Sequence, residues 1–134
     1  MESDSRRKII FTDEADRWYK ALSLEDTNRF AERMDFLREI GPNLGMPAVG
    51  LIKSSRHHNM KELRSKTGHL RILFAFDRNG HAVFLIGGDK TNKWTAWYRK
   101  NIPRADRLYD QHLRSIGKEK SWQRAGSRSG GRAR

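Results

Sequence analysis

Three short apolar segments between residues 60 and 86, separated by two turn sequences, restrict the fold of this chain more than any other feature. In the middle segment, residues 70–77, a large apolar side chain occupies every second position. This alternation is typical of a strand that packs one face on a core and leaves Arg71 on the other face. Turn residues at 65–68 and an Asn-Gly pair at 79–80 flank the segment. The pattern therefore predicts a three-strand antiparallel meander.

The residues before the meander predict one strand and two helices. Residues 8–12 are β-branched and aromatic, as expected for a first strand. Thr12 is placed to cap a first helix, and Ser23 to cap a second. The second helix has apolar side chains at the helical period and ends at a Gly-Pro pair after Ile40. Residues 43–52 contain glycine and proline and are predicted to form a linking loop.

The C-terminal part predicts helix and then disorder. A Gly87-Gly88 pair is expected to break the last strand, and residues 94–99 to form a short helical turn. A proline at the first helical position predicts a last helix over residues 103–113. After residue 117 the apolar pattern stops, and the sequence becomes basic and of low complexity. We therefore expect an α+β domain over residues 1–117 and a basic, disordered tail over residues 118–134.

Composition limits the chemistry that the chain can perform. With 28 Lys and Arg against 16 Asp and Glu, the formal net charge of the 134 residues is +12, which favours a polyanionic partner. The absence of cysteine excludes disulfides, thiolate nucleophiles and sulfur-ligated metal sites. No apolar stretch approaches the length that crosses a membrane. We expect a soluble, cytoplasmic protein with no membrane partner.

The positive charge is concentrated around the meander. Residues 53–71 contain six Lys or Arg side chains, three His side chains and a single acid, Glu62. A hairpin would bring the cations of its two arms onto one surface. A cationic surface of this kind is suited to a nucleic-acid backbone.

The order of elements and three phrases support a family resemblance. Lys61-Glu62-Leu63-Arg64, Leu70-Arg71-Ile72-Leu73-Phe74 and Gly88-Asp89-Lys90-Thr91 lie on or directly after three consecutive strands. Together they resemble the RelE/ParE toxin superfamily of type II toxin–antitoxin modules, and most closely its HigB-type, phage-derived branch. The resemblance covers residues 9–113 and implies a compact, RelE-like α+β fold.

The resemblance also implies a function and partners. Such toxins enter the ribosomal A site and cut translated mRNA without a metal or cofactor. A ribose 2′-oxygen attacks its own 3′-phosphate and the 5′-oxygen leaves, which requires a base, an acid and cations that stabilise charge on phosphorus. The implied partners are the ribosome, mRNA and a cognate antitoxin, expected to be a helix-turn-helix DNA-binding protein.

Site residues follow from the same resemblance. Arg71 matches the arginine that contacts the scissile phosphate, on the open face of the sheet. The full set with an implied catalytic role is Lys61, Arg64, Arg71, Lys90, His58 and Tyr98. Other basic side chains nearby are expected to bind nucleic acid: Lys53, Arg56, His57, Lys66, Lys93, Arg99 and Lys100. No metal-ligating residues are expected.

Alternative interpretations remain open for these residues and for the function. The alternatives for Arg71 are a solvent-facing charge and an ion pair with Glu62, and the alternative for His57 and His58 is a solvated pair without a catalytic role. A ParE-like toxin that inhibits DNA gyrase and cuts nothing has the same fold. A non-catalytic RNA-binding module is a third candidate. The nuclease is favoured because cations and possible proton carriers surround the same sheet.

Overall fold

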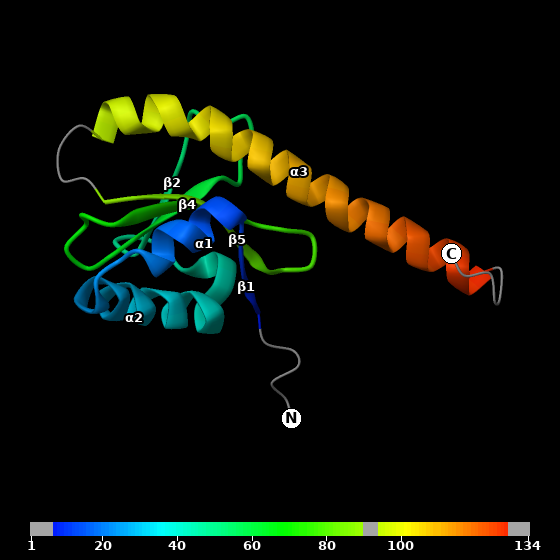
Figure 1. Ribbon diagram of the computed structural model, residues 1–134, viewed down its shortest axis with the longest axis horizontal. Coiled ribbons are helices and arrows are strands. Elements are labelled where there is room, and N and C mark those ends of the chain that lie inside the picture. The colour runs from blue at the N-terminus through cyan, green and yellow to red at the C-terminus, as the bar shows by residue number, and fades with distance from the viewer. Residues whose placement is uncertain (1–6, 90–93, 129–134) are drawn as a thin grey trace.

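The computed structural model describes residues 7–89 and 94–128, with side chains as far as residue 117. It has an α+β fold in which helices cover both faces of a five-stranded sheet (Figure 1). The elements in chain order are β1 (Ile9–Phe11), α1 (Asp13–Lys20), α2 (Leu24–Ile40), the 3₁₀ turn η2 (Gly41–Asn43), β2 (Val49–Leu51), β3 (Lys61–Arg64), β4 (Arg71–Phe76), β5 (Ala82–Gly88) and α3 (Trp94–Arg128). The predicted strand, helix pair, meander and C-terminal helix are confirmed.

The sheet has the strand order β1-β5-β4-β3-β2. Strands β2 to β5 pair antiparallel, and β1 joins β5 in parallel. β2 lies inside the segment 43–52 that was predicted to be a loop, and that prediction is wrong at residues 49–51. Three residues with a glycine in the middle carry too little alternation to be recognised, and pairing with β3 is what makes them a strand.

α1 and α2 pack on one face of the sheet. Thr12 and Ser23 are the N-caps, and their hydroxyl oxygens accept hydrogen bonds from the backbone N–H groups of Ala15 and Asp26, both at 3.1 Å. Buried side chains from the helices and from alternate strand positions form the core on this face: Phe30, Met34, Leu37, Leu63, Ile72, Phe74 and Phe84. The caps and the helical period therefore acted as the sequence predicts.

α3 covers the other face, so the sheet has no open face at its centre. The side chains beneath it include Met60, Leu73, Ala75, Val83, Leu85, Ile102 and Tyr109. The expectation of an open face carrying Arg71 is wrong, because the positions that alternate with the first apolar set, such as Leu73 and Ala75, are apolar too. A strand that is buried on both faces carries apolar side chains on both, so its sequence does not alternate between apolar and polar residues.

The glycine pair at the end of β5 continues the strand, contrary to the expectation that it breaks it. A Cβ on Gly87 would lie 2.3 Å from the indole of Trp18, and one on Gly88 would lie 2.6 Å from the indole of Trp97. The two glycines therefore allow one indole from each helical layer to pack directly on the backbone of β5.

α3 is one helix from Trp94 to Arg128 and contains Pro103. The predicted helical turn at 94–99 and the predicted last helix at 103–113 are both helical, but they are parts of one helix, and their separation is wrong. Pro103 cannot donate to the carbonyl of Arg99, but both residues are exposed, where water replaces the missing bond. Residues 118–128 continue α3, and residues 129–134 of the predicted disordered tail lie outside the described residues. The boundary at residue 117 stays a prediction.

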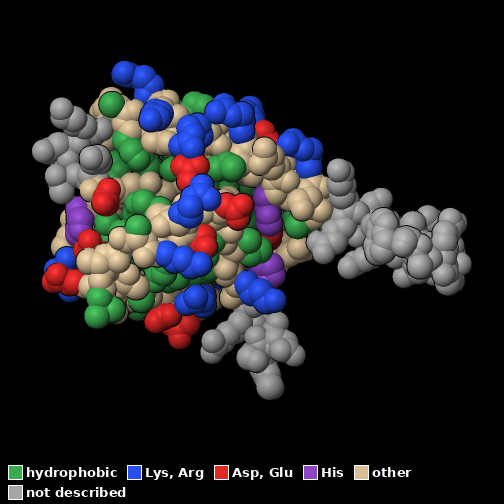
Figure 2. Space-filling view, viewed as in Figure 1, with side chains coloured by type: hydrophobic (Ala, Val, Ile, Leu, Met, Phe, Trp, Pro, Cys, Tyr) green, Lys and Arg blue, Asp and Glu red, His purple; other side chains and the backbone are tan. Residues whose placement is uncertain are grey.

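Lys and Arg side chains gather along the edge of the molecule where α3 lies (Figure 2). Within the described ranges, no helix combines the length and apolar character that crossing a membrane requires.

Candidate functional site

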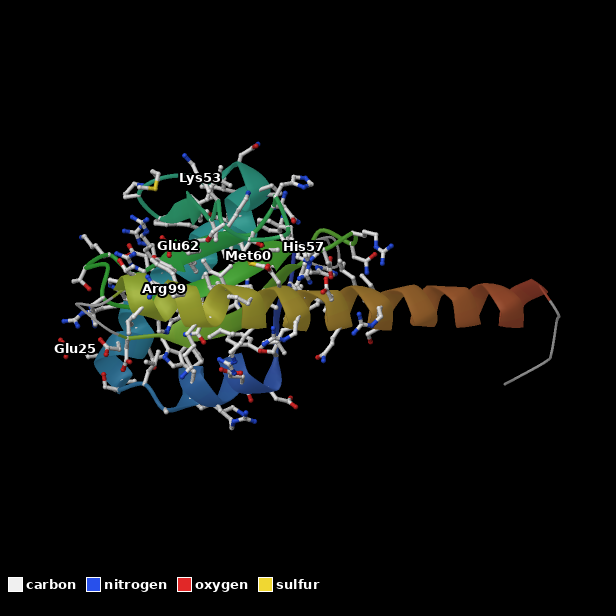
Figure 3. The ribbon with its side chains drawn as sticks, turned by 90° about the horizontal axis from the view of Figure 1, so that it is seen from above. Glu25, Lys53, His57, Met60, Glu62 and Arg99 are labelled. Carbon is white, nitrogen blue, oxygen red and sulfur yellow. The ribbon has the colours of Figure 1, made fainter. Side chains whose placement is uncertain are left out.

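A cleft of about 400 Å³ opens where β3 and β4 meet the first turns of α3. One wall comes from the segment that follows β2, and the opposite wall from α3. Its lining residues are Leu51, Ile52, Lys53, Ser54, Glu62, Arg64, Arg71, Tyr98 and Ile102. We call Glu62, Arg64, Arg71 and Tyr98 the cleft cluster. In Figure 3, Glu62 lies beside the first turns of α3, near Arg99, and Lys53 lies farther from the helix.

Strand register places three members of the cleft cluster on the face that α3 covers. Arg64 is directly opposite Arg71 across the β3–β4 pair, and Glu62 is opposite Leu73. Positions 62 and 64 point to the same side of β3 because side chains alternate along a strand. Tyr98 comes from the second turn of α3 and closes the cluster from above.

Glu62 is the centre of the cluster. Its side chain is 2% exposed, and its Oε2 accepts hydrogen bonds from Arg64, at 2.8 Å from Nε and 2.6 Å from Nη2. Its Oε1 accepts a hydrogen bond from the hydroxyl of Tyr98, and the Nη1 of Arg71 lies 3.8 Å from Oε2. Arg71 also donates from Nη1 to the hydroxyl of Tyr98 at 2.6 Å. One buried carboxylate thus orients two guanidinium groups and a phenol, and two positive charges against one negative leave the cluster cationic.

Tyr98 remains a proton donor in this environment. Burial raises the pKa of Tyr98, the hydrogen bond to Glu62 raises it further, and Arg71 partly opposes both effects. The phenol is therefore protonated at neutral pH. The guanidinium carbon of Arg71 lies 4.5 Å from the ring centroid of Trp94, which holds it in place from the α3 side.

Lys61 does not belong to this cluster, although the sequence analysis grouped it with Arg64 and Arg71. It points to the face covered by α1 and α2, where its Nζ donates to the carbonyl of Pro42 at 3.2 Å and lies 5.4 Å from the ring centroid of Phe76. Burial lowers the pKa of Lys61. Neighbouring residues on a strand face opposite sides, so Lys61 and Glu62 cannot share a surface.

The basic loop before β3 attaches to α3 through two acids. Asp106 accepts hydrogen bonds from the hydroxyl of Ser55 and from the backbone N–H of Arg56, the latter at 3.0 Å. Asp110 pairs with the guanidinium of Arg56 and with His57, whose Nε2 lies 2.8 Å away. Burial raises the pKa of Asp110, but the hydrogen bond from His57 and the charge of Arg56 lower it below its usual range. Arg56 and His57 therefore hold the loop on the helix.

His58 lies at a second pocket, of about 590 Å³, near the middle of α3. The lining residues of this distal pocket are His57, His58, Asn59, Arg78, Tyr109, Leu113, Arg114 and Gly117. Tyr98 of the cleft and Tyr109 of the distal pocket are eleven residues apart on one helix, which is about 16 Å. The predicted catalytic set is therefore divided: Arg64, Arg71 and Tyr98 meet in the cleft, and His58 lies elsewhere.

The other predicted nucleic-acid contacts are scattered around the cleft. Lys53 lines the cleft and is exposed, Lys66 is exposed in the β3–β4 turn, and Arg99 and Lys100 are exposed on α3. Lys90 and Lys93 lie outside the described residues. In the described part of the chain, no three His, Asp or Glu side chains are grouped as metal ligands are.

Sequence reasoning missed the structural importance of three acids. Glu62 was considered only as an ion-pair partner of Arg71, and that pairing is confirmed at 3.8 Å. The alternation that places residues 62 and 64 on one face was the available signal for the stronger pair with Arg64. Asp106 and Asp110 are four residues apart and therefore share one face of α3, but their partners in the loop were not recognisable from the sequence.

Comparisons with known proteins agree on one family. A family model described as phage-derived protein Gp49-like matches residues 17–110. The chain is 41% identical over 107 residues to "Putative toxin HigB3" of Mycobacterium tuberculosis, a match that covers 80% of this chain and 94% of that protein. It is 40% identical over 99 residues to "Putative toxin HigB2" of the same organism, covering 72% of this chain and 49% of that protein.

Two RelE proteins are among the solved structures that the chain matches. The isolated RelE toxin of Escherichia coli has a TM-score of 0.48 and 11% identity, over 73% of this chain and 97% of that one. The archaeal RelE–RelB complex from Pyrococcus horikoshii has a chain with a TM-score of 0.46 and 15% identity, over 65% of this chain and 98% of that one.

Proposed function

The chain belongs to the Gp49-like family of phage-derived proteins, and we propose that it is the toxin of a type II toxin–antitoxin module that cuts translated mRNA on the ribosome. Membership of the family confirms the resemblance to the phage-derived, HigB-like branch. The relatives support the assignment as a toxin. The nuclease activity is our proposal and depends on the cleft cluster.

The observation that supports cleavage is the convergence of two guanidiniums, a protonated phenol and a buried carboxylate in one cleft. Attack of a 2′-oxygen on the adjacent phosphate adds negative charge to the phosphoryl oxygens. Arg71 and Arg64 are preorganised by Glu62 to stabilise that charge. Preorganised donors of this kind contribute on the order of 10²–10³ in rate each.

Glu62 and Tyr98 supply the two proton transfers. Glu62 takes the proton of the 2′-hydroxyl as the oxygen–phosphorus bond forms. Tyr98 gives its proton to the 5′-oxygen as the phosphorus–oxygen bond breaks, so the products are a 2′,3′-cyclic phosphate and a 5′-hydroxyl. The hydrogen bond between Tyr98 and Glu62 then returns the proton from the carboxyl to the phenolate. Positioned acids and bases contribute about 10²–10⁴ in rate.

A cognate antitoxin is the expected protein partner. The cleft cluster and Lys53 form a cationic opening that an acidic segment of an antitoxin would neutralise. The mildly acidic surface of α1 and α2 is the alternative docking surface. Binding that is insensitive to salt would assign the antitoxin to those helices and not to the cleft.

Cleavage of a defined mRNA tests the proposal, with the protein added to a translation extract and to the same mRNA without ribosomes. Wild-type protein is expected to cut only with ribosomes, and Arg71→Ala to lose the activity. Arg17→Ala is the matched control because it removes an exposed guanidinium from α1, which covers the face of the sheet opposite the cleft. If the wild type cuts no mRNA and blocks supercoiling by DNA gyrase, the ParE-like function is correct and the nuclease is excluded.

A further inference from the structure

The outer face of α3 carries a straight row of cations that the cleft does not use. Lys100, Arg107 and Arg114 are exposed and follow one another at intervals of seven residues. We call these three residues the α3 stripe. Between residues 94 and 117 the acids are Asp106 and Asp110, and both bind the loop before β3. The outward face of this part of the helix therefore carries positive charge alone, and Figure 2 shows such side chains along this edge.

The stripe runs along α3 from the level of the cleft to the distal pocket. An interval of seven residues is about 10.5 Å along a helix, so the stripe is about 21 Å long. Each interval also turns the side chain by about 20°. This turn brings Arg114 to the side of α3 where it lines the distal pocket with His58 and Arg78. Lys100 lies two residues after Tyr98, about 200° around the helix, so the stripe begins on the side of α3 away from the cleft and ends at the distal pocket.

The stripe has no role in holding the described part of the fold together. None of its members forms an ion pair with an acid of residues 7–89 or 94–117, whereas Arg104 on the same helix pairs with Glu14 at 2.6 Å. The spacing is close to the Debye length at physiological salt, so mutual repulsion is small. Because this repulsion adds little to the free energy of the folded protein, the row of cations can remain unpaired and available to a polyanion.

We propose that the α3 stripe and the distal pocket bind the sugar–phosphate backbone of a helical RNA segment, separately from the strand that reacts in the cleft. The inference rests on the proposed function, because RNA in the cleft brings such segments to α3. The stripe itself contains no aromatic side chain, so it contacts phosphates and does not stack on bases. Recognition is therefore independent of base sequence and steeply dependent on salt.

The distal pocket lies at the C-terminal end of the α3 stripe. Its lining includes the uncharged residues Tyr109, Leu113 and Gly117 and the cations Arg78 and Arg114. Such a lining suits a sugar packed on the uncharged residues and a phosphate bound by the cations. Arg78 is held toward the helix by a hydrogen bond from its Nη2 to the carbonyl of Leu113 at 3.0 Å.

The test compares two triple variants that lose the same charge, both built on Arg71→Ala so that no RNA is cut. One carries K100Q, R107Q and R114Q in the stripe. The other carries R17Q, K20Q and R29Q, three exposed cations on α1 and α2, of which Lys20 and Arg29 form surface ion pairs. The probe is an RNA hairpin of roughly 16 base pairs, a length read by double-stranded RNA domains. Thermal melting checks that both variants are folded.

The stripe variant is expected to bind the hairpin at least about tenfold more weakly than the control variant, with a salt slope smaller by about two to three. Equal losses in the two variants would overturn the proposal and assign binding to net charge. An equal loss of affinity for duplex DNA would overturn the choice of RNA. Because this measurement needs no cleavage, it is independent of the nuclease test: an intact stripe effect in a protein that cuts no mRNA would refute only the proposed function.

Discussion

Tyr98 on α3 donates a hydrogen bond to the buried carboxylate of Glu62 on β3, and this contact joins the C-terminal helix to the meander inside the cleft. Arg71 donates to the same hydroxyl, so both guanidiniums and the phenol depend on one carboxylate for their positions. The cleft cluster therefore exists only when α3 is packed on the sheet. Activity and the docking of α3 are expected to be lost together.

Removing the hydroxyl of Tyr98 is expected to separate cleavage activity from the docking of α3. Tyr98→Phe keeps the ring against Trp94 and Trp97 but removes the proposed proton donor. We expect cleavage on ribosomes to fall by about 10²-fold or more, with an unchanged melting profile within a few degrees. Tyr19→Phe is the control, since Tyr19 packs in the core on the opposite face of the sheet. Wild-type cleavage by Tyr98→Phe would show that the phenol carries no proton in the reaction.

Glu62 is expected to matter for stability as well as for cleavage. Glu62→Gln leaves two guanidiniums facing a neutral amide, and a charged group without its partner costs about 1–3 kcal/mol. Urea denaturation should show a loss of this size in the free energy of unfolding. Glu25→Gln removes an exposed acid that pairs with Arg29 and should change stability by less than about 1 kcal/mol. Similar losses in both variants would contradict the central place of Glu62.

Gly88 should tolerate no side chain. A Cβ at this position would lie 2.6 Å from the indole of Trp97, so Gly88→Ala must displace the start of α3. Overpacking of this kind typically costs about 1–3 kcal/mol, and here cleavage should also fall because Tyr98 follows Trp97. Gly45→Ala is the matched control, because nothing lies within 4 Å of a Cβ placed there. The readouts are the urea midpoint and mRNA cleavage.

Stability should decrease in acid because of Asp77. Its side chain is fully buried and lies 2.8 Å from the Nε2 of His112 on α3. Burial raises the pKa of Asp77, but hydrogen bonds from His112 and from the backbone N–H groups of His81 and Asn79 together lower it below its usual value. A carboxyl with a lowered folded-state pKa contributes stability above its unfolded pKa and loses that contribution as the pH falls through the folded pKa.

The unfolding free energy of the wild type should therefore drop as the pH falls below about 4, the ordinary pKa of an aspartate, measured by urea denaturation. Asp77→Asn should be less stable near neutral pH and should show a shallower decline in acid. Asp35→Asn changes an exposed acid in a surface ion pair and should follow the wild-type curve. Parallel curves for wild type and Asp77→Asn would refute the assignment.

Part of the candidate site was predictable from the sequence. The predictable part depends on interactions between residues close in the sequence, and the rest depends on contacts between distant segments. Arg71 was assigned to the side of β4 opposite the first core, and it lies there with Arg64. The grouping with Lys61 failed because a charge count over a segment ignores the alternation of a strand. His58 was placed with the catalytic residues. However, the loop that carries it is bound to Asp106 and Asp110 of α3, and His58 therefore lines the distal pocket.

The sequence by itself determined the features that depend on neighbours within about four residues. The caps Thr12 and Ser23, the turns of the meander and the apolar stripe of α2 are of this kind, because local hydrogen bonds and helical or strand periods produce them. Only the tertiary structure decided that α3 runs through Pro103 and covers the second face of the sheet. Burial of Leu73, Ala75 and Ile102 stabilises that docking. The same docking brings Tyr98 to Glu62 across 36 positions of the chain, a distance over which no local pattern carries information.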